Sequence, residues 1–131
     1  MSTDDRLTTL LVKLNRLTSI GKLTWETQAP PDSILRGTDD QVPLYVVAYF
    51  KGQEFGLYER RYRLYDGEND RFYWSQEVVL ALLDIDGRAV WQTSSTSSAL
   101  IDLFETVRRK VSNVDAVIDR LLAEDDDAPA E

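Results

Sequence analysis

Two segments of the sequence carry apolar side chains at consecutive positions, and each would be apolar on both faces if it formed a strand. Residues 44–50 read LYVVAYF, and residues 78–83 read VVLALL. A sheet with one face in water alternates apolar and polar side chains instead. The central strands of this chain therefore need cover on both faces, either from its own helices or from a second chain.

Two arrangements supply that cover. In the first, an N-terminal helix packs on one sheet face and the C-terminal helices pack on the other. In the second, all helices share one face, and the other face presents an apolar patch of the kind that marks an interface. We favour the second arrangement, which makes Tyr45, Val47 and Tyr49 a candidate interface. Two-fold homodimers are the commonest assemblies, so the expected partner is a protein, with a second copy of the chain first.

An N-terminal helix is predicted over residues 4–20. Ser2 or Thr3 can cap it, and Gly21 supplies a stop. Leucines at spacings of three and four residues form its apolar face: Leu7, Leu10, Leu11, Leu14 and Leu17.

The middle of the chain predicts an antiparallel meander of about five strands, over residues 22–27, 44–51, 55–65, 71–85 and 88–93. Residues 30–43 hold three prolines and are typical of a loop. Asp86–Gly87 has the composition of a two-residue type I′ hairpin turn. Residues 75–83 also fit a short helix, but the Asp-Gly turn just beyond them favours a strand.

Apolar residues then keep a helical period from Leu100 to Leu122. Ser112 with Asp115 has the spacing of a capping box, which favours two helices with a bend at Ser112–Asn113 over one continuous helix. The acidic residues 124–131 are expected to be a disordered tail. The prediction is one α+β domain over residues 1–123: an N-terminal helix, the meander, and two C-terminal helices or one bent helix.

Composition narrows the function. The 131 residues include no cysteine and no histidine, which excludes disulfides, thiolate nucleophiles, imidazole catalysis and Cys/His metal sites. The net charge of −8 argues against nucleic-acid binding. Asp66, Glu68, Asn69 and Asp70 lack the spacing of a calcium loop and are typical of a turn. No catalytic motif is present, so we expect no enzyme, no cofactor and no metal site.

A small-ligand site is the alternative function. Of the 13 aromatic residues, ten lie between Tyr45 and Trp74 and are interleaved with arginines. Stacking and positive charge suit an anionic metabolite or a sugar, and the candidate residues are Tyr58, Arg60, Arg61, Tyr62, Arg63 and Trp74. Cross-strand aromatic pairs covered by arginine stems explain the same pattern without a ligand, and we favour that interpretation.

The N-terminus is acidic where a secretory signal would be basic. The longest uninterrupted apolar run, residues 78–83, is far shorter than the roughly 18 residues of a membrane helix. We therefore expect a cytoplasmic protein that does not bind membranes.

Three segments resemble small uncharacterised bacterial α+β proteins: GKLTWE at residues 21–26, LDIDG at 83–87, and VRR at 107–109 followed by NVDAVID at 113–119. The resemblance spans roughly residues 7–122 and implies an α+β fold and a bacterial origin, but no function. We expect a non-enzymatic protein-interaction module of the bacterial cytosol that self-associates through an apolar sheet face or edge.

Overall fold

The computed structural model describes residues 3–35, 38–95 and 97–123. The expected cap Ser2 and the expected disordered tail, residues 124–131, lie outside the described residues. The elements in chain order are α1 (Thr3–Ser19), β1 (Glu26–Gln28), α2 (Asp32–Leu35), β2 (Tyr45–Phe50), β3 (Gln53–Asp66), β4 (Arg71–Leu83), β5 (Ala89–Ser95), α3 (Ser98–Ser112) and α4 (Val114–Leu122).

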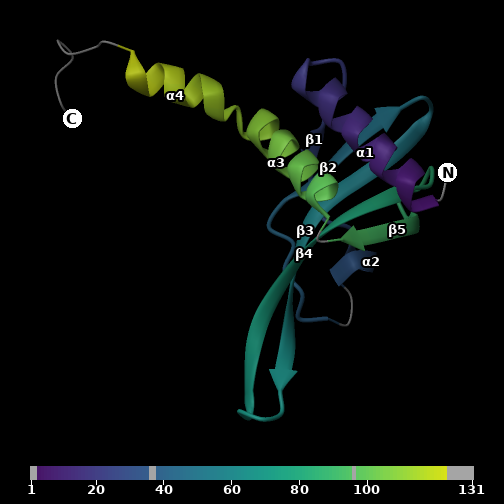
Figure 1. Cartoon of the computed structure of the whole chain (residues 1–131), viewed down its shortest axis with the longest axis vertical. Helices are drawn as coiled ribbons and strands as arrows, with labels where there is room; N and C mark the ends of the chain where they lie inside the picture. Colours follow the sequence, from purple (N-terminus) through teal and green to yellow (C-terminus); the bar gives the residue numbers. More distant parts are fainter. Residues whose placement is uncertain (1–2, 36–37, 96, 124–131) are drawn as a thin grey trace.

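The five strands form one antiparallel sheet in the order β1-β2-β3-β4-β5, so each strand lies beside its neighbour in sequence (Figure 1). The predicted α+β architecture is confirmed, with its N-terminal helix, five-stranded meander and two C-terminal helices. The bend is confirmed as well: Asn113, at φ 54° and ψ 40°, adopts the left-handed conformation between α3 and α4.

Three local predictions differ from the structure. The expected loop over residues 30–43 contains α2, a single helical turn. In the expected strand over residues 22–27, only residues from Glu26 onward join the sheet, because Leu23 and Trp25 turn into the core. The type I′ turn at Asp86–Gly87 is wrong: within residues 84–88, all of them described, only Gly87 has a positive φ.

Side-chain hydrogen bonds explain the loop before β5. The Asp84 carboxylate accepts the backbone N–H groups of Asp86 and Arg88, both at 2.9 Å, and these bonds hold the pKa of Asp84 below its usual range. These hydrogen bonds stabilise a connection between β4 and β5 that is longer than two residues. The turn in which both central residues have positive φ joins β2 to β3 instead, at Lys51 (51°) and Gly52 (81°).

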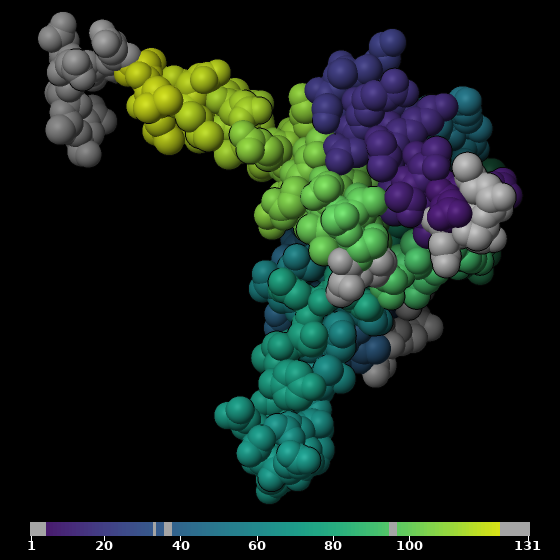
Figure 2. Space-filling view, in the orientation of Figure 1, coloured from purple at the N-terminus to yellow at the C-terminus, as the bar shows by residue number. Residues whose placement is uncertain are grey.

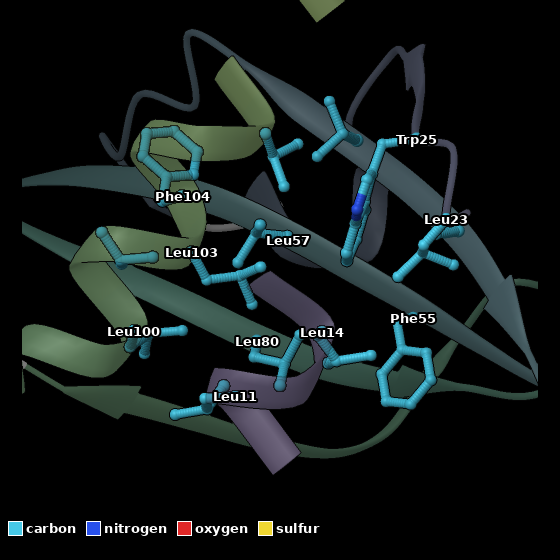
Figure 3. Packing of buried hydrophobic residues seen from close by; sticks show 14 residues of the cluster. Leu11, Leu14, Leu23, Trp25, Phe55, Leu57, Leu80, Leu100, Leu103 and Phe104 are labelled. Carbon is cyan, nitrogen blue, oxygen red and sulfur yellow. The ribbon is translucent and has the colours of Figure 1, made fainter. Parts of the chain in front are cut away.

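The main core lies between one sheet face and the helices α1 and α3, which pack side by side on it (Figures 1 and 3). Val46, Leu57 and Leu80 are neighbours across β2, β3 and β4 and point into this core. The helices contribute the rest of the apolar layer, including Leu11, Leu14, Leu100, Leu103, Phe104 and Val107.

The other sheet face is covered by the segment between β1 and β2. The side chains buried on this sheet face are Tyr45, Val47, Tyr58, Val79, Ala81 and Leu83. Ile34 of α2 and Val42 pack against them. Neither of the two expected arrangements describes this: the helices α1 and α3 share one face, and an irregular segment with one helical turn covers the other. The chain itself therefore covers most of both apolar faces of the central strands.

Candidate functional site

The strands β3 and β4 continue past the rest of the sheet as a two-stranded extension, which we call the arm (residues 60–77). β3 pairs with β4 as far as Asp66 and Arg71, whereas the pairing of β3 with β2 ends at Tyr58 and that of β4 with β5 ends at Val78. Among the described residues, the segment before β2 contacts the base of the arm through a β-bridge between Gln41 and Arg61 and through ion pairs of Asp40 with Arg60 and of Asp39 with Arg63. Figures 1 and 2 show the arm projecting from the body of the molecule.

Large apolar side chains are exposed on both faces of the arm. Side chains alternate along a strand, and directly paired residues share a face. Tyr65, Phe72 and Trp74 therefore lie on the face that continues from the main core, with Arg61 and Arg63. Leu64 and Tyr73 lie on the opposite face with Tyr62. The five most exposed of these apolar side chains are between 38% and 59% accessible.

Ring contacts and ion pairs organise the arm. The rings of Tyr65 and Phe72 lie 5.2 Å apart, and the guanidinium of Arg63 lies 4.5 Å from the centre of the Phe72 ring. Arg63 also pairs with Asp39 at 3.0 Å. Tyr65 donates its hydroxyl to Asp70, which raises the pKa of Tyr65.

The six residues proposed for ligand binding do not converge on one site. Arg61, Arg63 and Trp74 lie on the core-side face of the arm, and Arg60 and Tyr62 lie on the other face, where the Arg60 guanidinium is 5.1 Å from the Tyr62 ring. Tyr58 is buried on the covered face of the sheet.

A hollow of about 490 Å³ does include two of those six residues. Tyr58 and Arg60 line it together with residues of β5 and its preceding loop: Arg88, Ala89, Val90, Trp91 and Gln92. Both arginines are already paired, Arg60 with Glu77 and Asp40, and Arg88 with Asp84 and Asp86. The Nε of Arg60 has no partner among the described residues, but this atom is buried. An anion would have to compete with four carboxylates here.

The three residues proposed as an interface are divided by the structure. Tyr45 and Val47 are only 2% and 5% exposed, because α2 and Val42 pack over them, so the expectation of an open patch at these two positions is wrong. Tyr49 is 70% exposed near the end of β2. One exposed aromatic side chain does not make a patch, whereas the arm carries five exposed large apolar side chains.

The helix α4 is the second projecting element. It extends away from the body in Figures 1 and 2, and none of its side chains is buried by the described part of the chain. Leu121 and Leu122 are 72% and 74% exposed. Its apolar face consists of Val114, Val117, Ile118, Leu121 and Leu122, at spacings that place them on one side of a helix.

The sequence does not show that the apolar face of α4 is exposed, because the apolar period runs unbroken from α3 into α4. Periodicity identifies an apolar face but not what covers it. The bend at Asn113 was the available signal, since it directs the last helix away from the sheet. The sequence predicts strands that include Leu64, Tyr65, Phe72 and Tyr73. It does not show that β3 and β4 extend beyond β2 and β5.

The polar turn at the tip of the arm is held by its own hydrogen bonds. Asp66 accepts the Asn69 side-chain amide at 2.7 Å and the backbone N–H of Glu68 at 3.1 Å, and these bonds lower the pKa of Asp66. Among the described residues, no group of three or more acidic side chains is arranged to hold a metal ion.

In the part of the chain that the structure describes, no helix is both long and apolar enough to cross a membrane. Comparison of the chain with protein-family models, with curated proteins and with solved structures finds no match.

Proposed function

We propose that this protein is a non-enzymatic interaction module that self-associates, and that the arm is its docking surface. The observation that carries the proposal is the exposure of Leu64, Tyr65, Phe72, Tyr73 and Trp74 on one projecting ribbon. Tyr65, Phe72 and Trp74 lie together on one face of the ribbon, and Leu64 and Tyr73 lie on the other. Clustered exposed apolar side chains of this kind mark interaction sites on soluble proteins. A two-stranded ribbon without further cover is also only marginally stable in water, so a partner on the arm would stabilise it.

The polar groups of the arm favour docking over catalysis. Arg60, Arg61 and Arg63 lie against aromatic rings or pair with nearby carboxylates, as Arg63 does with Phe72 and Asp39. Aromatic residues and arginines are the side chains most enriched where protein partners bind tightly. A second copy fits as the partner because the chain itself supplies a matching surface: α4 has an uncovered apolar face and is followed by acidic residues.

Binding of a small anion in the hollow beside Tyr58 and Arg60 is less well supported. The hollow is large enough for a metabolite, but each of its two arginines already pairs with two carboxylates of the same chain.

The proposal is tested by the molar mass in solution, measured by light scattering over a hundredfold concentration range. We expect a species near twice 15.0 kDa for the wild-type chain. Replacing Phe72 and Trp74 by serine removes two exposed aromatic side chains from one face of the arm. Burial of each contributes about 1.5–3 kcal/mol, so the dissociation constant should rise at least tenfold for the pair.

Val90→Ser is the matched control, because Val90 is 65% exposed on the same sheet but outside the arm. Circular dichroism checks that each variant is folded. A wild-type chain that stays at 15.0 kDa throughout contradicts self-association. A dimer that Phe72→Ser and Trp74→Ser leave intact, and that Tyr49→Ser dissociates, would move the interface to the edge of β2.

A further inference from the structure

We infer that α4 of a second copy packs on the core-side face of the arm, the face formed by Tyr65, Phe72 and Trp74 with Arg61 and Arg63. The inference rests on the proposed self-association and names the segment that occupies the docking surface. By two-fold symmetry, each copy would supply one helix and receive one.

Both elements are only partly covered in the single chain: on α4, Val114 and Val117 are half-buried, whereas Ile118, Leu121 and Leu122 are exposed. An isolated helix of nine residues is too short to be stable in water by itself, so α4 depends on packing for its stability. Its apolar face is about 13 Å long at 1.5 Å per residue. The core-side face of the arm runs four residues from Tyr65 to Arg61, about 13 Å at 3.3 Å per residue. Tyr65, Phe72 and Trp74 form the apolar half of that length, and Arg63 and Arg61 extend it toward the body.

The charges of the two elements are complementary. Residues 114–131 carry seven acidic side chains and one basic side chain, a net charge of −6 out of −8 for the whole chain. The core-side face of the arm carries Arg61 and Arg63, whose side chains are 48% and 43% exposed although each has a carboxylate neighbour. Asp115, Asp119 and Arg120 give α4 itself a net charge of −1, and the residues that follow it in the sequence carry the other five carboxylates. The acidic C-terminal segment is therefore attracted to this face of the arm.

The helix of the same copy cannot reach this surface. A shallow hollow between α3 and the base of the arm is lined by Ile101, Phe104 and Glu105 on the helix and by Gln76 on β4. α4 starts ten residues beyond Phe104 and leads away from the arm (Figure 1). If α4 folded straight back along α3, its nine residues would end near Phe104, at the base of the arm, and would not reach Phe72 further along it.

The joint also holds α4 in its outward direction. The backbone N–H of Asn113 bonds to the carbonyl oxygens at the end of α3, and Arg109 donates to the Asp115 carboxylate at 2.7 Å. That ion pair lowers the pKa of Asp115 below its usual range. Fixed in this way, α4 presents its apolar face to another molecule and not to its own sheet.

Disulfide trapping tests the inference, because the native chain has no cysteine and gives no background. A tagged Phe72→Cys chain is mixed with an untagged Ile118→Cys chain under mild oxidation. Tyr73→Cys is the matched control on the arm, since it lies next to Phe72 but on the opposite face. Ala116→Cys is the control on α4, on the side away from Ile118. We expect the first pair to form at least five times more mixed dimer than either control pair.

Three other results would overturn the inference. An Ile118→Cys chain that couples to Leu10→Cys in preference to Phe72→Cys would place α4 in the apolar groove of about 600 Å³ beside α1, which Leu7, Leu10, Phe55, Leu82 and Trp91 line. A monomeric disulfide in the Phe72→Cys, Ile118→Cys double variant would mean that α4 folds back on its own arm. Equal cross-linking of all pairs would mean that contacts are random.

A parallel measurement separates this inference from the proposed function. The Ile118→Asp, Leu121→Asp variant should keep its fold, because both side chains are exposed, and its dimer should dissociate at least tenfold more readily. A dimer unaffected by this variant but dissociated by Phe72→Ser and Trp74→Ser would refute α4 as the occupant and leave self-association through the arm standing. A wild-type monomer would refute both.

Discussion

At the scale of single residues, one polar group inside the main core determines how α1 meets the start of the sheet. Thr18 is 1% exposed, and its hydroxyl donates to the carbonyl oxygen of Leu14 at 2.7 Å. The Thr18 hydroxyl oxygen in turn accepts the indole N–H of Trp25 at 3.0 Å. Trp25 can therefore be buried with its polar group satisfied, and the chain turns from α1 into β1 around this contact.

Replacing Thr18 by valine should destabilise the protein by about 1–3 kcal/mol, the cost of leaving the buried Trp25 N–H unpaired. Urea unfolding followed by far-ultraviolet circular dichroism measures the loss. Thr9→Val is the matched control, because Thr9 makes the same bond to the carbonyl four residues earlier, Asp5, but on the exposed side of α1. Its effect should stay within about 0.5 kcal/mol. Equal losses in both variants would show that the Trp25 contact contributes nothing.

The Tyr45 ring is closely packed on the covered face of the sheet. Its ring lies 5.6 Å from that of Tyr58 and directly over Gly56, where a Cβ atom would come within 2.8 Å of the hydroxyl. The hydroxyl is buried without a hydrogen-bond partner among the described residues. Burial raises the pKa of Tyr45 to about 12.

Tyr45→Phe should therefore leave stability at neutral pH unchanged or increase it by about 1 kcal/mol, since it removes an unpaired buried polar group. In the wild type, the unfolded chain ionises Tyr45 near pH 10 while the folded chain keeps its proton to about pH 12. Stability is therefore lost as the pH rises from 10 to 12. The Tyr45→Phe chain should lose less over this interval, as urea unfolding at a series of pH values would show. Parallel curves for both chains would disprove the assignment.

At the scale of elements, β3 and β4 have packing neighbours near the middle of the sheet but few neighbours in the arm. Near Leu57 and Leu80 they lie in the middle of the sheet with a core on both faces, whereas near Tyr65 and Phe72 they pair only with each other. The arm therefore has few neighbours to keep its backbone hydrogen bonds closed. Local opening needs least free energy where burial is least.

Hydrogen exchange should reveal this gradient. Amides at residues 62–65 and 72–75 should exchange at least a hundredfold faster than those at residues 55–58 and 79–83 of the same strands when the protein is dilute. At concentrations that favour association, protection of the arm should rise while protection of the central residues stays the same, because a bound partner stabilises only what it covers. Uniform protection along both strands at all concentrations would contradict an uncovered arm.

At the scale of the whole molecule, the described residues form a body with two unequal cores and two projections. The larger core lies under α1 and α3, and the smaller one lies under α2 and its flanking residues. The arm and α4 leave this body in different directions, as Figure 2 shows. An apolar strand pair and an apolar helix that a single chain leaves in water are both accounted for if two copies cover them reciprocally.

The sequence predicts the order of elements well because local signals specify it. Leucine spacing predicts α1, the turn residues around 51–52 and 66–70 separate long β segments, and the bend at Asn113 is visible in the residues around it. It predicts the candidate site poorly. The aromatic residues of β3 and β4 stand out as a group in the sequence. No local signal distinguishes Tyr58, which is buried, from Phe72, which is exposed.

What the sequence alone determined is therefore the order of the long helices and strands, without α2, and the need to cover both faces of the central strands, because periodicity and turn chemistry act over a few residues. Tertiary structure alone decided what supplies that cover and where it ends. Tyr45 and Val47 became core because a segment with Ile34 and Val42 folds over them. Tyr65, Phe72 and Trp74 became surface because β2 and β5 stop short of the arm. Burial depends on which distant segments come together, and that is a property of the whole fold.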